Sequence, residues 1–405
     1  MENTPWRIIF IGAGASLVLL VLVYFIALPK TADYDAEKID RIMEFHDSFF
    51  SGHENGRKVW EFRADRGWSG KDREVTYFEG ITRGRFFSSG EVIVKDLIAP
   101  RVQARKSSKL IEAFGMLEND LIKRSRLRAV VAFTPKGKRK FALLTADHIT
   151  YDPNAKRSML DGNISLKDKD SDLMADHMTI DHENEVATLS DHIRTVRKEL
   201  GLTSDSLNYF ARDERMVAGG HVRCRIAGKP SPTLVSCGLM EFYIDQGRDV
   251  NASGSLEVIQ GKKAVVAEQM TYRNPAKEVI LSGNVRTVIQ KAGSIFKPGT
   301  AAKIKSGEAR KLLAEKTFIT SDSLTLSTRV GDAVAAGNVH VYQKGREGKA
   351  EKASYSDPSE ILTLTGQVFL KKEKQWIKCQ SIQVSVKNET FNAVGSVEAE
   401  FRIKK

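Results

Sequence analysis

The stretch ADHITYDPNAKRSMLDGNISL, residues 146–166, is one copy of a unit that recurs along most of the 405-residue chain. A small residue and an acidic one, Ala146 and Asp147, precede two alternating apolar residues, and a polar turn leads to a second alternating segment containing Gly162. Such alternation on both sides of a turn is typical of β-strands. The unit therefore predicts two strands joined by a turn.

The spacing within and between units indicates a repeat architecture. Asp147 and Gly162 are 15 residues apart, and Asp147, Asp176 and Asp205 follow one another at intervals of 29 residues. The 15-residue step recurs in Asp65 and Gly80, Pro100 and Gly115, Asp176 and Asp191, Asp205 and Gly220, Glu268 and Gly283, Asp322 and Gly337, Glu351 and Gly366, and Gln380 and Gly395, while Gly238 and Gly254 fit with one extra residue. A fixed period in this range predicts stacked units, each burying its apolar face against its neighbours.

The alignment of the units also predicts which side chains face the interior. The position of Ala146 is small in every unit, and certain positions on both strands are nearly always apolar. Since side chains alternate faces along a strand, these positions stack into an apolar seam, while the glycine position marks a bend or bulge. The seam positions are Ile149, Tyr151, Leu160, Ile164, Leu166, Met178, Ile180, Ile193, Leu207, Tyr209, Val222, Met240, Phe242, Leu256, Met270, Tyr272, Val285, Leu324, Val339, Tyr355, Val368 and Val397.

The N-terminal region has a different composition. Residues 8–28 are 21 consecutive residues without a charge, and a helix of about 20 apolar residues spans a bilayer core. A cleaved signal peptide is the alternative, but no convincing cleavage site follows, so we expect a retained transmembrane anchor over residues 1–30. Gly12 and Ser16 suit close approach of a partner helix, although small residues are common in all membrane helices. Residues 31–54 are expected to form a stalk with a short amphipathic helix between residues 35 and 50.

Two segments carry a resemblance to a known family. LTADHITYDPNAKRSMLDGNISL (residues 144–166) and KAEKASYSDPSEILTLTGQVFL (residues 349–370), with the single N-terminal anchor, resemble the periplasmic bridge proteins of lipopolysaccharide export, the LptC and LptA or OstA-like family. The resemblance covers residues 55–405. It implies an all-β, elongated, twisted open β-jelly roll of about ten two-strand units. Because LptC-like members are usually shorter, we interpret residues 55–295 as LptC-like repeats and residues 296–405 as LptA- or OstA-like repeats.

The resemblance also implies a function. It predicts an inner-membrane protein of a Gram-negative bacterium whose periplasmic body accepts lipopolysaccharide from the membrane subunits of an ABC exporter and passes it outward through an apolar groove. A further bridge protein or the outer-membrane translocon would add to an exposed edge strand, for which residues 397–403 are the candidate. The alternative is an anchored β-repeat scaffold with a closed core and no lipid cargo.

The composition and the motifs exclude most catalytic functions. The net charge of +12 suits any anionic partner as well as solvated strand surfaces, and we expect no nucleic acid. Four Asp-His pairs, at residues 147–148, 176–177, 181–182 and 191–192, have zinc-ligand chemistry, but alternation turns His148 and His177 outward and no third unit repeats them. No phosphate-binding loop, dinucleotide fingerprint or GxSxG elbow occurs. We therefore expect no enzyme, no metal and no cofactor.

The three cysteines all occupy interior positions. Cys224 and Cys237 flank the turn at residues 228–232, so either a cross-strand disulfide or two buried free thiols fits the sequence. Cys379 is expected to be a free thiol.

Overall fold

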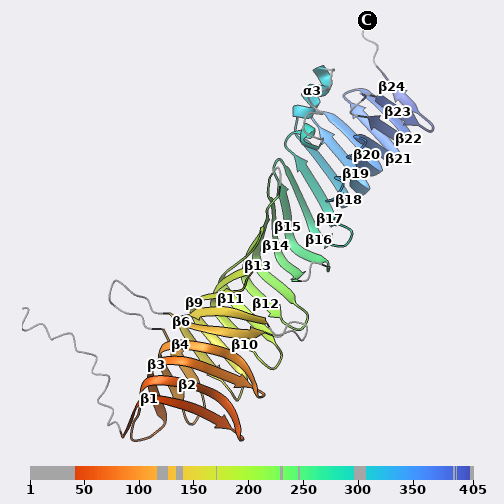
Figure 1. Ribbon diagram of the computed structural model, residues 1–405. Coiled ribbons are helices and arrows are strands. Elements are labelled where there is room, and N and C mark those ends of the chain that lie inside the picture. The colour runs from red at the N-terminus through yellow and green to blue at the C-terminus, as the bar shows by residue number, and fades with distance from the viewer. Residues whose placement is uncertain are drawn as a thin grey trace, which may run out of the picture.

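The computed structural model describes residues 42–115, 126–133, 140–169, 171–228, 231–244, 247–295, 307–385, 388 and 390–401. Nearly all of these residues lie in β-strands, and the strands form one 24-stranded sheet in which every pairing is antiparallel. Figure 1 shows an elongated body in which the colour runs steadily from one end to the other, so units adjacent in sequence are adjacent in space. The predicted all-β repeat architecture is confirmed.

The strands are mostly 11 to 15 residues long, and two short helices interrupt them near one end. The elements are β1 Met43–Glu54, β2 Arg57–Ser69, β3 Val75–Ser88, β4 Glu91–Arg105, β5 Ile111–Phe114, β6 Leu127–Phe133, β7 Lys140–Ala146, β8 His148–Asp152, β9 Arg157–Lys167, β10 Ser171–Asp181, β11 Val186–Arg197, β12 Leu200–Phe210, β13 Arg215–Ile226, β14 Thr233–Tyr243, β15 Val250–Gln260, β16 Lys263–Arg273, β17 Glu278–Ile289, the 3-10 helix η2 Ala292–Ile295, α3 Gly307–Ala314, β18 Thr317–Ser327, β19 Ala333–Gln343, β20 Arg346–Ser356, β21 Ile361–Lys372, β22 Gln375–Ser385, β23 Thr390–Val394 and β24 Glu398–Glu400.

The helix expected between residues 35 and 50 is wrong from residue 43 onward, because β1 is a strand paired with β2. The ring of Phe50 packs against that of Phe78, with centroids 4.7 Å apart, and this contact with a distant strand decides the conformation. Short apolar runs fit either period. The anchor expected at residues 1–30, with Gly12 and Ser16, lies outside the described residues. Within the described part, no helix is long and apolar enough to span a membrane.

Each long strand bends in its middle. In β9, Gly162 and Asn163 both have positive φ angles, 75° and 46°, and the pairing of β9 with β10 is interrupted between Ala175 and His177. Two successive left-handed residues redirect the strand, as expected for a bulge at a glycine. The predicted bend is confirmed. We call the line of bends the corner.

The corner divides the sheet into two layers. The first layer contains residues 157–161 of β9 and 177–181 of β10, and the second contains residues 164–167 and 171–175 of the same strands. We call each bent strand that crosses the corner a rung. Two rungs are made of two separate strands each. The strand β4 pairs with β5 in the first layer and with β6 in the second, and β9 pairs with β8 in the first layer and with β7 in the second. The strand pairs β5–β6 and β7–β8 therefore each correspond to one bent rung.

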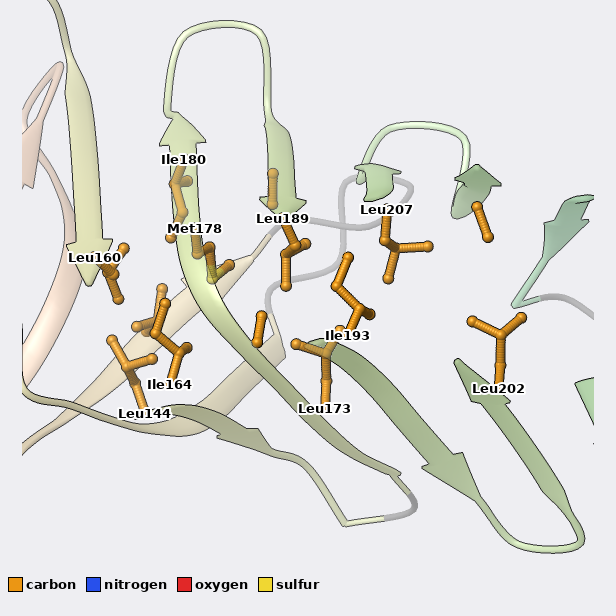
Figure 2. Close-up of a cluster of buried hydrophobic side chains, with 14 of the residues drawn as sticks. Leu144, Leu160, Ile164, Leu173, Met178, Ile180, Leu189, Ile193, Leu202 and Leu207 are labelled. Carbon is orange, nitrogen blue, oxygen red and sulfur yellow. The ribbon is translucent and has the colours of Figure 1, made fainter. Parts of the chain in front are cut away.

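The interior between the layers is apolar and continuous. In Figure 2, Leu160, Met178, Ile180, Leu189 and Leu207 of the first layer face Leu144, Ile164, Leu173, Ile193 and Leu202 of the second. One buried cluster extends from Phe62 to Val339, and a smaller one continues it from Ala350 to Ile382. Since β17 pairs with β18, Val285 opposite Ser321, the sheet continues past η2 and α3. The division into LptC-like residues 55–295 and LptA-like residues 296–405 stays a prediction.

We predict that Gly162→Ala destabilises the protein by about 1–3 kcal/mol, the cost of forcing a residue with a side chain into a strained left-handed conformation. The added Cβ would also lie 2.7 Å from Oδ2 of Asp147. Urea unfolding followed by circular dichroism measures the effect. Gly201→Ala is the control, because a Cβ there meets no atom within 4 Å. Equal unfolding midpoints for the two variants would contradict this role of the bend.

Candidate functional site

The structure places nearly all the predicted seam residues in the interior. Buried are Ile149, Tyr151, Leu160, Ile164, Met178, Ile180, Ile193, Leu207, Val222, Met240, Leu256, Met270, Val285, Leu324, Val339, Tyr355 and Val368, and half-buried are Leu166, Tyr209, Phe242 and Tyr272. Val397 is an error, since its side chain is 50% exposed. It lies between β23 and β24 at the end of the sheet, where no described rung covers it.

The repeat alignment missed a second set of interior residues. These are Leu144, Leu173, Leu189, Leu202, Val235, Leu281, Leu364 and Ile382, all buried. Each lies two residues along the strand from another interior position, as Leu144 does from Ala146, and strand alternation was the signal that could have identified them. The small positions, such as Ala146 and Ala175, line the inside of the corner, where the two layers converge and leave no room for larger side chains.

Aromatic rings fill the interior at the N-terminal end. Trp60 stacks on Phe62 with centroids 4.9 Å apart, and Phe62 meets Phe78 edge-on at 4.8 Å. Phe86 and Tyr151 stack at 4.9 Å. Farther along, burial raises the pKa of Tyr209 to about 12, so its hydroxyl stays neutral at physiological pH. At these positions the interior offers apolar rings and a neutral hydroxyl.

Opposite the corner, the strand connections form two rims. The first-layer rim includes the connections β2–β3, β4–β5, β8–β9, β10–β11, β12–β13, β14–β15, β16–β17, β18–β19 and β20–β21, and the second-layer rim includes β1–β2, β3–β4, β9–β10, β11–β12, β13–β14, β15–β16, β19–β20 and β21–β22. We call the line between the two rims the mouth.

The rims touch at several places in the N-terminal half. Nζ of Lys109 lies 2.6 Å from Oε1 of Glu54. The hydroxyl of Tyr151 donates to the carbonyl oxygen of Phe87 at 2.8 Å, and Nη1 of Arg197 donates to that of Ile244 at 3.3 Å. Each contact joins one rim to the other, so the mouth is held closed there by a few polar contacts.

The acidic residue of each unit has a structural role at the corner. Its side chain lies over the left-handed glycine 15 residues later, as Asp147 does over Gly162, and it usually accepts a hydrogen bond from the residue after that glycine. The donors are Nδ2 of Asn163 to Asp147 at 2.6 Å, Nδ1 of His192 to Asp176 at 2.6 Å, Nδ1 of His221 to Asp205 at 2.7 Å, Nδ2 of Asn284 to Glu268 at 2.6 Å and Nδ2 of Asn338 to Asp322 at 3.0 Å. Residues 15 apart in the sequence therefore face each other across neighbouring strands at the bend.

The Asp-His pairs adjacent in sequence are not the pairs that meet in space. His177 donates to Asp161 of the neighbouring strand at 2.7 Å, and His148 stacks on Phe114 with ring centroids 4.6 Å apart. Among the described residues, no group of three or more potential ligands is arranged to hold a metal ion. The carboxylates at the corner thus have hydrogen-bond partners within the sheet.

The cysteines are buried free thiols, so the disulfide alternative for Cys224 and Cys237 is wrong. Cys224 is opposite Val235, and Cys237 is opposite Val222. The two cysteines are therefore diagonal neighbours, about 7–8 Å apart in an antiparallel pair, and a disulfide requires a shorter separation. Burial raises the pKa of Cys224 to about 11, which keeps the thiol protonated. Cys379 is free, as predicted.

A bent antiparallel sheet with a continuous apolar interior is an elongated β-jelly roll. Residues 143–304 match the family described as LptA/(LptD N-terminal domain) LPS transport protein. The match covers less than half of the chain, and it supports a relation of this segment to the lipopolysaccharide-transport bridge family, whose members are transport components and not enzymes.

Two further comparisons add little. No curated protein matches the chain. Among solved structures, the chain is similar to LptH, the LptA-homologous periplasmic component of the lipopolysaccharide transport device of Pseudomonas aeruginosa, with 13% identity over 43% of this chain and 96% of that chain and a TM-score of 0.25. A likeness at this TM-score carries no argument.

We predict that Tyr151→Phe lowers the free energy of unfolding by about 1 kcal/mol, because the carbonyl oxygen of Phe87 loses its hydrogen bond across the mouth. Chemical denaturation of the purified protein measures the change. Tyr342→Phe is the control, since Tyr342 is about half exposed in β19 and its hydroxyl has no hydrogen bond within the described residues. An unchanged stability for Tyr151→Phe would mean that this contact does not hold the rims together.

The histidines predict two opposite pH dependences. The hydrogen bond to Asp176 raises the pKa of His192, so this pairing stabilises the fold at acidic pH and is lost as pH rises through the raised pKa. Burial lowers the pKa of His182 to about 4, so its contribution is present above its ordinary pKa of 6.5 and is lost as pH falls toward 4.

Ring-proton NMR titration measures both values. We expect Asp176→Asn to lower the pKa of His192 toward its ordinary value and to leave that of His182 unchanged. A pKa of His192 that does not respond to this substitution would contradict the corner hydrogen bond.

Proposed function

We propose that the protein is an inner-membrane-anchored periplasmic bridge that accepts lipopolysaccharide from the membrane subunits of an ABC exporter and passes it toward the outer membrane. The observation that carries this proposal is the apolar interior, which continues from Phe62 through Val339 to Ile382 with its rungs stacked in sequence order. The seam residues between Ile149 and Val368 would contact the acyl chains. Each CH₂ group of an acyl chain that is buried contributes about 0.8 kcal/mol to the free energy of binding.

Entry of acyl chains requires that the two layers separate at the mouth. Within the described residues the chain passes from one layer to the other only at the corner, while the mouth is held by side-chain packing and a few polar contacts, such as Arg197 with Ile244. Acyl chains entering between the layers replace the apolar contacts that separation removes.

The two ends of the bridge are assigned distinct partners. The charge-free residues 8–28 support the membrane anchor, and close packing through Gly12 and Ser16 would place it against exporter helices. At the other end, Phe391 and Val394 of β23 are each more than half exposed. This edge would accept a strand from a further bridge protein or from the outer-membrane translocon.

An anchored scaffold with a closed core is the second candidate, and the completely buried side chains of Phe62 and Leu97 favour it. In that case the interior would be an ordinary packed core, and partners would bind only on the outer surface of the layers. The two candidates differ in whether lipid ever contacts the interior.

Site-specific photo-crosslinking in cells distinguishes them. We expect a photoreactive residue at Tyr209, Val285 or Val368 to give lipopolysaccharide adducts that depend on ATP hydrolysis by the exporter. The matched controls are His177 and Arg286, whose side chains are exposed on the outside of the layers. Adducts at the outer positions, with none at the inner ones, would eliminate the transport interior and leave the scaffold.

A further inference from the structure

The outer faces of the two layers differ in chemistry along the same strands. On β11 to β22, the two outward positions of the first layer nearest the corner are mostly serine, threonine, asparagine and glutamine, and only Glu241 and Lys352 among them are charged. On the second layer the corresponding positions include the cations Arg194, Arg223 and Arg286. We call the outward side of the first layer on β11 to β22 the neutral face.

Polar side chains on the neutral face form rows along the body. On the neighbouring strands β15 to β18, one row of successive strand partners consists of Ser253, Gln269, Ser282 and Ser323. Adjacent strands lie about 4.8 Å apart, so hydroxyl and amide groups recur at short, regular intervals. Both groups donate and accept hydrogen bonds. The neutral face therefore offers hydrogen bonds without attracting ions of either sign.

The neutral face has a hollow of about 310 Å³ near the C-terminal end of the body. Its floor is one row of strand partners on β19 to β22, which we call the floor row and which consists of Val334, Ser354, Thr363 and Gln383. The floor row faces outward, because the adjacent residues Ala335, Leu364 and Ile382 are buried in the interior. Asp332 and Ile361 line the end of the hollow nearest the first-layer rim.

The groups that line the hollow suit a sugar ring. One carboxylate oxygen of Asp332 accepts a hydrogen bond from the backbone N–H of Asp357 at 2.9 Å, and the second oxygen can accept further hydrogen bonds. The hydroxyls and the amide of the floor row offer donors and acceptors, while Val334 and Ile361 offer apolar contact. A pyranose ring presents the complementary combination, with hydroxyl groups around its edge and C–H groups on its two faces.

The charges around the hollow disfavour an anionic ligand. Among the described residues that line it, Asp332 alone is charged. Burial, and after it the neighbouring carboxylates, that of Asp357 first, raise the pKa of Tyr355 beside the hollow to about 12. Lys352, the one cation at the outward positions of the neutral face nearest the corner, belongs to the next row. A phosphate or carboxylate in the hollow would therefore meet like charge.

We propose that the hollow binds one unit of an uncharged glycan strand, whose neighbouring units lie along the polar rows of the neutral face. Asp332 accepts hydrogen bonds from sugar hydroxyls, Ser354 and Thr363 exchange hydrogen bonds with them, and Val334 contacts the face of the ring. The hollow opens on the outside of the first layer, so the strand is separate from any cargo between the layers. Such binding goes beyond the proposed transport function and would hold the body at a glycan layer with its interior free.

The test compares two double variants. The hollow variant carries Ser354→Ile and Thr363→Ile, which fill the hollow and remove two hydroxyls while keeping residues that favour strands. The control carries Thr179→Ile and Thr188→Ile, an outward pair of strand partners on β10 and β11. Full-length protein in detergent is titrated into chitotetraose, a neutral tetrasaccharide, and binding is measured by ligand-observed NMR.

We expect the wild type and the control to bind chitotetraose equally, and the hollow variant to lose about tenfold in affinity through lost hydrogen bonds and lost space. Equal binding by the hollow variant and the control would overturn the inference. A wild type that does not bind chitotetraose would overturn it as well.

A second variant tests the charge. Asp332→Asn keeps an oxygen that can accept the N–H of Asp357 and removes the carboxylate charge. We expect the wild type to reject tetragalacturonate, an anionic tetrasaccharide, and Asp332→Asn to bind chitotetraose more weakly and to lose this discrimination. A wild type that prefers the anionic tetrasaccharide would contradict the proposed site.

Competition identifies the source of the glycan. Soluble glycan strands of the cell wall and lipid-free saccharide of lipopolysaccharide are added separately to the complex of the wild type with chitotetraose. We expect the cell-wall strands to displace chitotetraose; displacement by the lipopolysaccharide saccharide alone, or by neither, would overturn the inference. Crosslinking at Val285 tests the transport function separately, and the hollow variant is expected to retain those adducts.

Discussion

The pair of left-handed residues in the middle of every second long strand, from β9 to β21, is the constraint on which the structure depends. At Gly162 and its equivalents, positive φ turns the strand through the corner, and the carboxylate 15 residues earlier occupies the space that a Cβ would need. The same carboxylate accepts a hydrogen bond from the next residue, Asn163 in this rung. Because the bend falls at the same position in successive rungs, the corners align and a flat sheet becomes two facing layers.

The corner also determines how the layers can move. Each rung crosses from one layer to the other only there, while the far side is closed by packing and by contacts such as Lys109 with Glu54. Parting the layers at the mouth breaks no backbone pairing within either layer. The cost is lost apolar contact, which acyl chains restore. In the proposed function, tight packing in the absence of lipid and access to lipid would thus be properties of the same interior.

The sequence predicted the repeated features and failed at the unrepeated ones. Gly162 identified the bend and alternation identified Ile164 as an interior residue, because both positions have the same surroundings in every rung. The strand β1 could not be predicted from the spacing of its apolar residues, since its conformation is decided by the contact of Phe50 with Phe78. Val397 failed because the alignment assumes a covering rung that the end of the sheet does not provide.

Other features depended on strand register, which spacing alone does not determine. Cys224 and Cys237 flank a turn symmetrically, yet the register places them diagonally and leaves both thiols free. The sequence predicted no catalytic role for the acidic residues, but their position over the glycine became evident only with the pairing of the strands.

Successive rungs of similar lining have a consequence for directional transport. A lipid would gain little free energy by moving from contacts with Val222 to contacts with Val285, because both positions hold a valine buried in the interior. Net movement along such an interior needs a supply at one end and removal at the other. In the proposed function, the protein would accordingly provide the path for the cargo, and an energy-consuming exporter would provide the direction.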